Sequence, residues 1–282
     1  DDWLPALKAG ETVFSGDTDQ LRYALEATGD SRATESLVAL LQNGNVDAPN
    51  LPNVVKTVAG LGGVEEIDMV LSLAKKQPTL LTPIVAGARH NKATPKGIKK
   101  ILPLLKNQDS DVRRAAAELT GIWGITDAGE SLEKLVRNTE NIQERLTAAR
   151  ALGRLKHFDR LANLANPNQS QKIRIAATAI WAENQPDKAR ESVIEIFAKA
   201  STIQEIEPLF LSFINRQSGD KQLQEALKDT PLHESIAIEG IRLIRSSGRE
   251  FPELVAMLTK SGNLKLVPLD LSQKDRKELL SK

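Results

Sequence analysis

The chain contains no cysteine among its 282 residues. Disulfides, thiolate nucleophiles, cysteine-based zinc sites and covalent c-type haem attachment all need that side chain, so we exclude them within this chain. Aromatic residues are also scarce, at 4%, which is little for a domain built around one deep core. This composition favours small helices that pack through Ala, Leu, Ile and Val.

The sequence also lacks an excess of charge and any long apolar run. Lys and Arg number 38 against 37 Asp and Glu, a formal net charge of +1, so no overall field attracts nucleic acid or an acidic membrane. No apolar run approaches the roughly 20 residues of a membrane span. The first residues have neither the basic nor the apolar region of a signal peptide. We therefore expect no nucleic-acid partner, no membrane span and no signal peptide in this chain.

The most informative feature that is present is a recurring phrase. Residues 113–121, RRAAAELTG, are echoed by residues 145–153, RLTAARALG, and less closely by residues 174–181, RIAATAIW. The copies begin about 30 residues apart, a period typical of helical repeat arrays. In such arrays each helix pair buries its apolar face against its neighbours.

Apolar residues recur at helical spacing almost throughout, for example over 54–61 and 98–105. The breaks are short and polar, and those at 107–110 and 138–141 offer helix N-caps. No segment combines strand alternation with a hairpin turn. We predict an all-α fold.

The predicted architecture is a right-handed α-solenoid of about seven short helix pairs. It occupies residues 1–262 and includes an irregular N-terminal cap over about 1–30. From residue 263 the repeat pattern stops, and Pro268 interrupts the segment that follows. We expect residues 263–282 to form an extended connector and a short terminal helix.

The recurring phrase is similar to the second helix of the short form of the HEAT repeat. In that family an Arg precedes an Ala pair and a Leu-Gly end. The matching positions are Arg113, Ala116, Ala117 and Gly121, then Arg145, Ala148, Ala149, Leu152 and Gly153, then Arg174 and Ala177, with Trp181 in place of the usual Leu. We expect the alanines to allow close inter-repeat packing and each Arg to fix the register between repeats. Each Gly is expected to end its helix at positive φ.

Two other repeat families fit less well. The ankyrin signature Thr-Pro-Leu-His occurs once, at residues 230–233. The aromatic and proline pattern of tetratricopeptide repeats is absent.

A second resemblance covers most of the chain. Residues 21–33 and 241–255 resemble the beginning and end of the HEAT-like region in large multidomain proteins of planctomycetes and verrucomicrobia. Those proteins are described as membrane-bound dehydrogenases or PVC-type haem-binding proteins. The resemblance implies a β-propeller before this region, a c-type cytochrome after it, and a periplasmic or otherwise exported location. It assigns no enzyme activity to these residues.

Few residues suggest chemistry. His90, His157 and His233 lie in separate repeats, and none has a second His four residues away on a helix to share a metal. We expect them to be exposed or to cap helices, and we expect no catalytic residue, metal or cofactor. The glycine-rich segment 59–63 lacks the Gly-Lys-Ser/Thr ending of a phosphate loop, and we interpret it as a helix end.

Two groups of cations are candidates for binding an anionic partner, although solvated surface charge is the simpler interpretation of both. The first surrounds one loop and comprises Arg89, His90, Lys92, Lys96, Lys99 and Lys100. The second comprises Arg242, Arg245 and Arg249, whose spacing would place them on one helix face. We expect Trp123 and Trp181 to pack between repeats rather than to stack on a ligand.

The leading functional hypothesis is a non-enzymatic scaffold. It would bind a protein partner, or space two domains of a larger exported redox protein. One alternative is a HEAT-like lyase of the kind that acts on bilin-carrying proteins, but one Tyr and three scattered His offer little for its pocket. The other is a HEAT-like nucleic-acid-binding solenoid, as in alkylpurine glycosylases, which would need a basic concave stripe.

Overall fold

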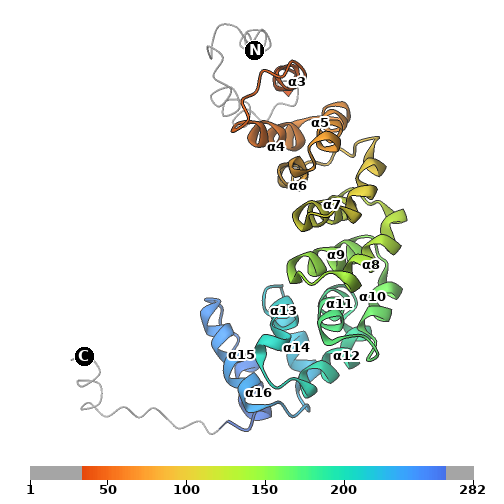
Figure 1. Ribbon diagram of the computed structural model, residues 1–282. Helices are drawn as coiled ribbons and strands as arrows, with labels where there is room; N and C mark the ends of the chain where they lie inside the picture. Colours follow the sequence, from red (N-terminus) through yellow and green to blue (C-terminus); the bar gives the residue numbers. More distant parts are fainter. Residues whose placement is uncertain (1–33, 265–282) are drawn as a thin grey trace, which may run out of the picture. The chain divides into compact units, whose positions relative to one another are not determined.

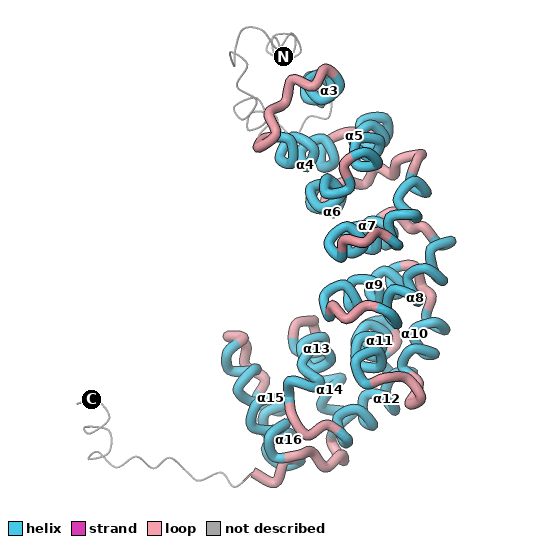
Figure 2. The backbone as a smooth tube through the Cα atoms, viewed as in Figure 1, coloured by secondary structure: helices cyan, strands magenta, loops and turns pink. Residues whose placement is uncertain are grey.

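The computed structural model describes residues 34–264, and every regular element in that range is a helix (Figures 1 and 2). The all-α prediction is confirmed for this range. The expected N-terminal cap and almost all of the expected connector and terminal helix lie outside the described residues. Packing divides the chain into two compact units, Asp1–Trp181 and Ala182–Lys282.

The helices are short and follow one another with brief connections. Those of the first unit are α3 (Thr34–Gln42), α4 (Leu51–Leu61), α5 (Val64–Lys76), η2 (Pro78–Leu80), α6 (Leu81–Ala88), η3 (Ile98–Lys106), α7 (Ser110–Ile122), η4 (Thr126–Ala128), α8 (Gly129–Asn138), α9 (Ile142–Arg154) and α10 (Phe158–Ala165). Helix α11 (Gln171–Asn184) crosses the division between the units. Those of the second unit are α12 (Pro186–Lys199), α13 (Ile203–Ile214), α14 (Gly219–Leu227), α15 (Glu234–Ser246) and α16 (Pro252–Ser261).

Within each unit, alternate helices pack on one another. In the first unit α4 contacts α6, α6 contacts α7 and α7 contacts α9, while η3 contacts both α5 and α8, and α8 contacts α10. In the second unit α13 contacts α15, and α14 contacts both α12 and α16. Helices of the described part therefore contact helices further along the chain as well as sequence neighbours, for example α7 with both η3 and α9.

The polar breaks act as helix caps, as the sequence predicts. The Asp109 carboxylate accepts a hydrogen bond from the backbone N–H of Asp111 at 2.8 Å at the start of α7. The Asn141 side chain accepts from the N–H groups of Gln143 and Glu144, at 2.9 and 3.2 Å, at the start of α9. These bonds satisfy N–H groups that have no partner within the helix.

One segment with helical apolar spacing is not an α-helix. Residues Ile98–Lys106 form the 3₁₀ helix η3, which contains Pro103. Proline has no N–H to donate, and its ring would clash with the carbonyl four residues earlier in an α-helix. The tighter 3₁₀ winding still buries Ile101 and Leu105.

The repeated glycines do not end their helices, so that prediction is wrong. Gly121 lies inside α7 and Gly153 lies inside α9. The positive φ values that follow these helices belong to Gly124 and Lys156, at 66° and 60°. The turn therefore falls three residues later than the sequence phrase suggests.

Gly121 instead allows helices α7 and α9 to approach closely. A Cβ built on Gly121 would lie 3.1 Å from the Cα and 3.3 Å from the Cβ of Ala151 on α9. It would also lie 3.2 Å from Cδ of Arg154. The missing side chain thus makes room for the α9 backbone and for the stem of Arg154.

The three repeated alanines, Ala116, Ala148 and Ala177, are all fully buried. Because the space around Ala148 is filled, Ala148→Leu is expected to overpack α9 and lower the free energy of unfolding by roughly 1–3 kcal/mol. Urea denaturation followed by circular dichroism measures the loss. Gln143→Leu, at an exposed position of the same helix, is the matched control and should change stability little. Equal stability of the two variants would contradict the assigned repeat frame.

Candidate functional site

Long-range side-chain hydrogen bonds fall within a narrow range of sequence separation in each unit. In the first unit, such bonds link residues 27–32 positions apart. In the second unit the corresponding separation is 34–35 positions. The separation in the first unit matches the spacing of the recurring phrase, about 30 residues, and the separation in the second unit is a few residues longer.

The most buried of these contacts is the ion pair between Arg113 and Glu144. The Glu144 side chain has no exposed surface, and it accepts from Nη2 of Arg113 at 2.9 Å and also from Nε. The Thr139 hydroxyl donates to the same carboxylate at 2.5 Å. Arg113 also donates through Nη1 to the carbonyls of Asn107 and Gln108. The hydrogen bond to Glu144 raises the pKa of Arg113.

The other two arginines of the repeated phrase make a different kind of contact. Arg145 is buried, and it donates to the carbonyls of Val136 and Thr139, at the end of α8. Arg174 Nε donates to the carbonyl of Ala165, at the end of α10, at 3.2 Å. These bonds join α8 to α9 and α10 to α11, whereas Arg113 joins α7 to α9. The role of the three arginines in register between repeats stays a prediction.

A second group of side chains lies just after helix ends and bonds to carbonyls far away in the sequence, and the sequence analysis did not identify these residues as one group. Asn91 donates to the carbonyls of Ala59 and Gly62, and Nε2 of His157 lies 3.0 Å from the carbonyl of Thr126. In the second unit, Nη1 of Arg216 donates to the carbonyl of Ala182 and Nη1 of Arg249 to that of Ile214. All four residues follow the end of a helix by two or three positions, a signal that could have revealed them.

Arg216 is partly buried. Its guanidinium lies 4.7 Å from the centre of the Phe213 ring, and Nη2 donates to Oε1 of Gln222 at 2.5 Å. Burial lowers the pKa of Arg216, and the charge of Glu183 acts in the opposite direction. The ring and the two hydrogen bonds hold this cation in place at the end of α13.

The predicted face of Arg242, Arg245 and Arg249 does not exist as a unit. Helix α15 ends at Ser246, and Gly248 follows with φ of 68°. Arg249 therefore leaves the helix and binds the Ile214 carbonyl at 2.6 Å. Arg242, which pairs with Glu239 at 3.4 Å, and Arg245 remain exposed on α15.

The basic cluster around residues 89–100 is divided among several acidic partners. Arg89 pairs with Glu118 at 2.8 Å, and this hydrogen bond raises the pKa of Arg89. Lys96 pairs with Glu65 at 3.1 Å, which lowers the pKa of Glu65. Lys92 is exposed. This group therefore does not form one anion-binding site.

The remaining candidates have structural surroundings. His90 is exposed, and His233 caps α15 by accepting from the N–H of Ser235 at 3.3 Å. Trp123 is buried in the core of the first unit, and Trp181 packs against that core. In the glycine-rich segment, α4 ends at Leu61 as predicted. Between residues 34 and 264 no group of three or more His, Asp or Glu could hold a metal ion.

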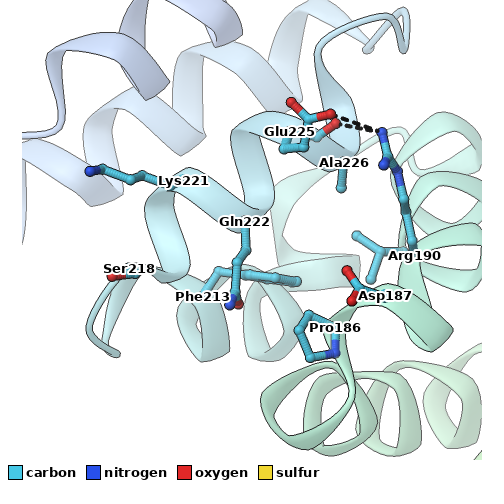
Figure 3. Close-up of a pocket in the computed structure, with 10 residues that line it drawn as sticks. Pro186, Asp187, Arg190, Phe213, Ser218, Lys221, Gln222, Glu225 and Ala226 are labelled. Atoms are coloured by element: carbon cyan, nitrogen blue, oxygen red, sulfur yellow. Dashed lines mark hydrogen bonds and ion pairs between the residues drawn. The ribbon is translucent and has the colours of Figure 1, made fainter.

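One cleft lies in the second unit between α12, α13 and α14, with a volume of about 230 Å³. Figure 3 shows Arg190 and Glu225 facing each other across it, above the ring of Phe213. Nη2 of Arg190 donates to the Glu225 carbonyl at 2.9 Å and lies 3.5 Å from its carboxylate. Lys228 and, more weakly, Arg190 lower the pKa of Glu225. The ion pair closes one side of the cleft.

A larger and more polar groove lies in the first unit, across α6, α7 and α9, with a volume of about 530 Å³. We call it the arginine groove, because four arginines line it. Two are paired within the groove, Arg89 with Glu118 and Arg114 with Asp111, at 2.8 and 2.9 Å. The other two, Arg150 and Arg154, are exposed on α9. The four arginines and two acids leave the groove positive.

Comparison with protein-family models, curated proteins and solved structures finds no match to this chain. None of the helices in the described part of the chain combines the length and the apolar character needed to cross a membrane. The case for function therefore depends on the packing and on the two clefts.

Proposed function

We propose that this chain is a right-handed α-solenoid of about seven HEAT-like helix pairs that acts as a non-enzymatic scaffold. The order of the helices supports this arrangement. Taking α3 with α4 as the first pair and α14 with α15 as the last gives seven pairs, and α16 follows as an unpaired helix. The second helices of successive pairs pack on one another within each unit.

The observation that carries the proposal is the narrow range of separation between residues joined by long-range side-chain hydrogen bonds, 27–32 positions in the first unit and 34–35 in the second. A repeat array makes each polar bond one period long, because each pair contacts only its neighbours. In this proposal the arginines of the recurring phrase hold the array together. Arg145 binds helix-end carbonyls, and Arg113 binds the buried Glu144 carboxylate. These bonds support a structural role, because both arginine side chains are occupied by backbone carbonyls or by a carboxylate of the same chain.

The proposed partners are other protein domains, in particular a β-propeller and a c-type cytochrome on the same polypeptide, in an exported redox protein. This part of the proposal comes from the family resemblance of residues 21–33 and 241–255. In it the present chain carries no cofactor, and any dehydrogenase activity belongs to its neighbours. Neither of the two clefts described above is lined by His or Tyr, which speaks against the bilin-lyase alternative.

The proposal is tested by calorimetric titration of this chain with separately prepared β-propeller and c-type cytochrome domains from a protein of the resembling family. Domains joined in one chain experience effective concentrations near the millimolar range, so weak contacts suffice. We expect saturable binding of at least one domain with a Kd below about 1 mM. An unrelated cytochrome of similar net charge is the control. Absence of saturable binding to both family domains, or equal binding of the control, would contradict the interdomain role.

A further inference from the structure

We propose that the arginine groove binds an extended, acidic segment of a protein partner, through Arg150 and Arg154. This inference rests on the proposed scaffold function and names the chemistry of what the scaffold would hold. The groove is the larger of the two clefts described above, at about 530 Å³, and it lies wholly within the first unit.

Four side chains of α9 form one polar stripe in the groove. Gln143, Thr147, Arg150 and Arg154 line it at spacings of four, three and four residues, which place them on a single helix face. At 1.5 Å per residue, the stripe is roughly 16 Å long. An extended peptide of about five residues covers that length. The stripe is thus sized for a short linear segment.

The ion pairs in the groove show which of its four arginines have no acidic partner in the described part of the chain. On α7, Asp111 binds Arg114, and Glu118 binds Arg89. Among the described residues, no hydrogen bond or ion pair occupies Arg150 or Arg154. A guanidinium binds a carboxylate through two parallel hydrogen bonds. The carboxylates of Asp111 and Glu118 already bind two of the four arginines in this way or through a single bond. The free pair on α9 therefore favours two carboxylates from outside.

The spacing of Arg150 and Arg154 predicts the sequence pattern of the peptide that they would bind. Arg150 and Arg154 are four residues apart on a helix, a rise of about 6 Å. Alternate residues of an extended chain are about 6.6 Å apart and point to the same side. An acidic-x-acidic segment running along α9 would present one carboxylate to each arginine. The stem of Arg154 lies over Gly121, at the point where the absence of a side chain leaves room for it, so this arginine is partly positioned in advance.

A protein segment fits the groove better than a nucleic acid. Asp111 and Glu118 also line the groove, and each already binds one of its arginines. Nucleic-acid affinity depends on many simultaneous phosphate contacts, typically about 6–10, whereas only two arginines are free here. Gln143 and Thr147 add an amide and a hydroxyl, which suit the backbone groups of a peptide.

The test is fluorescence-anisotropy titration with a labelled peptide, Gly-Ser-Asp-Ser-Asp-Ser-Gly, and with its Asn-x-Asn counterpart. We expect the acidic peptide to bind with a Kd on the order of 100 μM and the amide peptide at least tenfold more weakly. Binding should weaken as salt rises, because both arginines are exposed. Equal affinity for the two peptides, or no saturation by 1 mM acidic peptide, would overturn the proposal.

The double variant Arg150→Gln/Arg154→Gln assigns the binding to the groove. It should weaken binding of the acidic peptide at least tenfold, while circular dichroism and the thermal melt stay unchanged. The matched control, Arg242→Gln/Arg245→Gln, removes two exposed arginines from α15 and should leave binding unchanged. An equal loss in both double variants would mean non-specific attraction and would overturn the proposal.

Two further titrations separate the remaining outcomes. One uses a labelled single-stranded oligonucleotide, and the other is the titration with the family domains described above. Tighter binding of the oligonucleotide than of the acidic peptide, lost in Arg150→Gln/Arg154→Gln, would assign the groove to nucleic acid and overturn the peptide proposal. If the family domains bind the chain while the acidic peptide does not, only the groove proposal fails. If neither the domains nor the peptide binds, the scaffold proposal fails with it.

Discussion

Gly87→Ala is expected to destabilise the first unit by about 3 kcal/mol, although alanine is the better helix former at most helical positions. A Cβ at Gly87 would lie 2.3 Å from the carbonyl oxygen of Lys56 and 2.7 Å from the backbone nitrogen of Gly60. Both atoms belong to the backbone of α4 and cannot rotate away. Helices α4 and α6 would have to separate, which would weaken the packing between them. Thermal melts should fall by roughly 6–12 °C.

The matched control is Gly60→Ala, on the opposite side of the same contact. A Cβ at Gly60 would meet Gly87 at 3.5 Å, an ordinary van der Waals distance. Because alanine costs less backbone entropy than glycine in a helix, this variant should be neutral or up to about 1 kcal/mol more stable. Similar losses in Gly60→Ala and Gly87→Ala would show that the two helices do not approach as described.

The second large effect is expected from Arg113→Met. Glu144 is fully buried, and Arg113 supplies its only guanidinium partner among the described residues. Removing that cation leaves an uncompensated buried carboxylate, which typically costs about 3–5 kcal/mol. The measurement is the free energy of unfolding from urea titration at neutral pH. The double variant Arg113→Met/Glu144→Gln also removes the charge of the buried carboxylate and should recover part of the lost free energy of unfolding.

Lys172→Met provides the comparison for an exposed ion pair between residues that are similarly far apart in the sequence. Lys172 lies 3.3 Å from Glu140, and the two side chains are 70% and 87% exposed. Exposed pairs contribute little, so this variant should change stability by less than about 0.5 kcal/mol. If Lys172→Met and Arg113→Met lose the same stability, burial of Glu144 is not what makes its ion pair important.

The sequence alone was sufficient to predict the all-α class, the helix caps and the buried alanines, although it placed the positive-φ turns after α7 and α9 three residues too early. The all-α fold follows from apolar spacing, and the caps at Asp109 and Asn141 follow from the side-chain chemistry of the polar breaks. Burial of Ala116, Ala148 and Ala177 follows from the recurring phrase. Each of these properties depends on residues within about one or two helical turns, so a single stretch of sequence contains the needed information.

Only the tertiary structure decided which residues of different pairs meet. Arg113 finds Glu144 because of the register between α7 and α9, and Arg249 binds the Ile214 carbonyl because Gly248 turns the chain out of α15. The arginine groove combines side chains from three helices that are about 30 residues apart. Helical periodicity states which face of each helix is buried, but it contains no information about how far one helix slides along the next. That offset is set by close contacts such as Gly87 against Gly60, where the backbone of one helix meets the backbone of another.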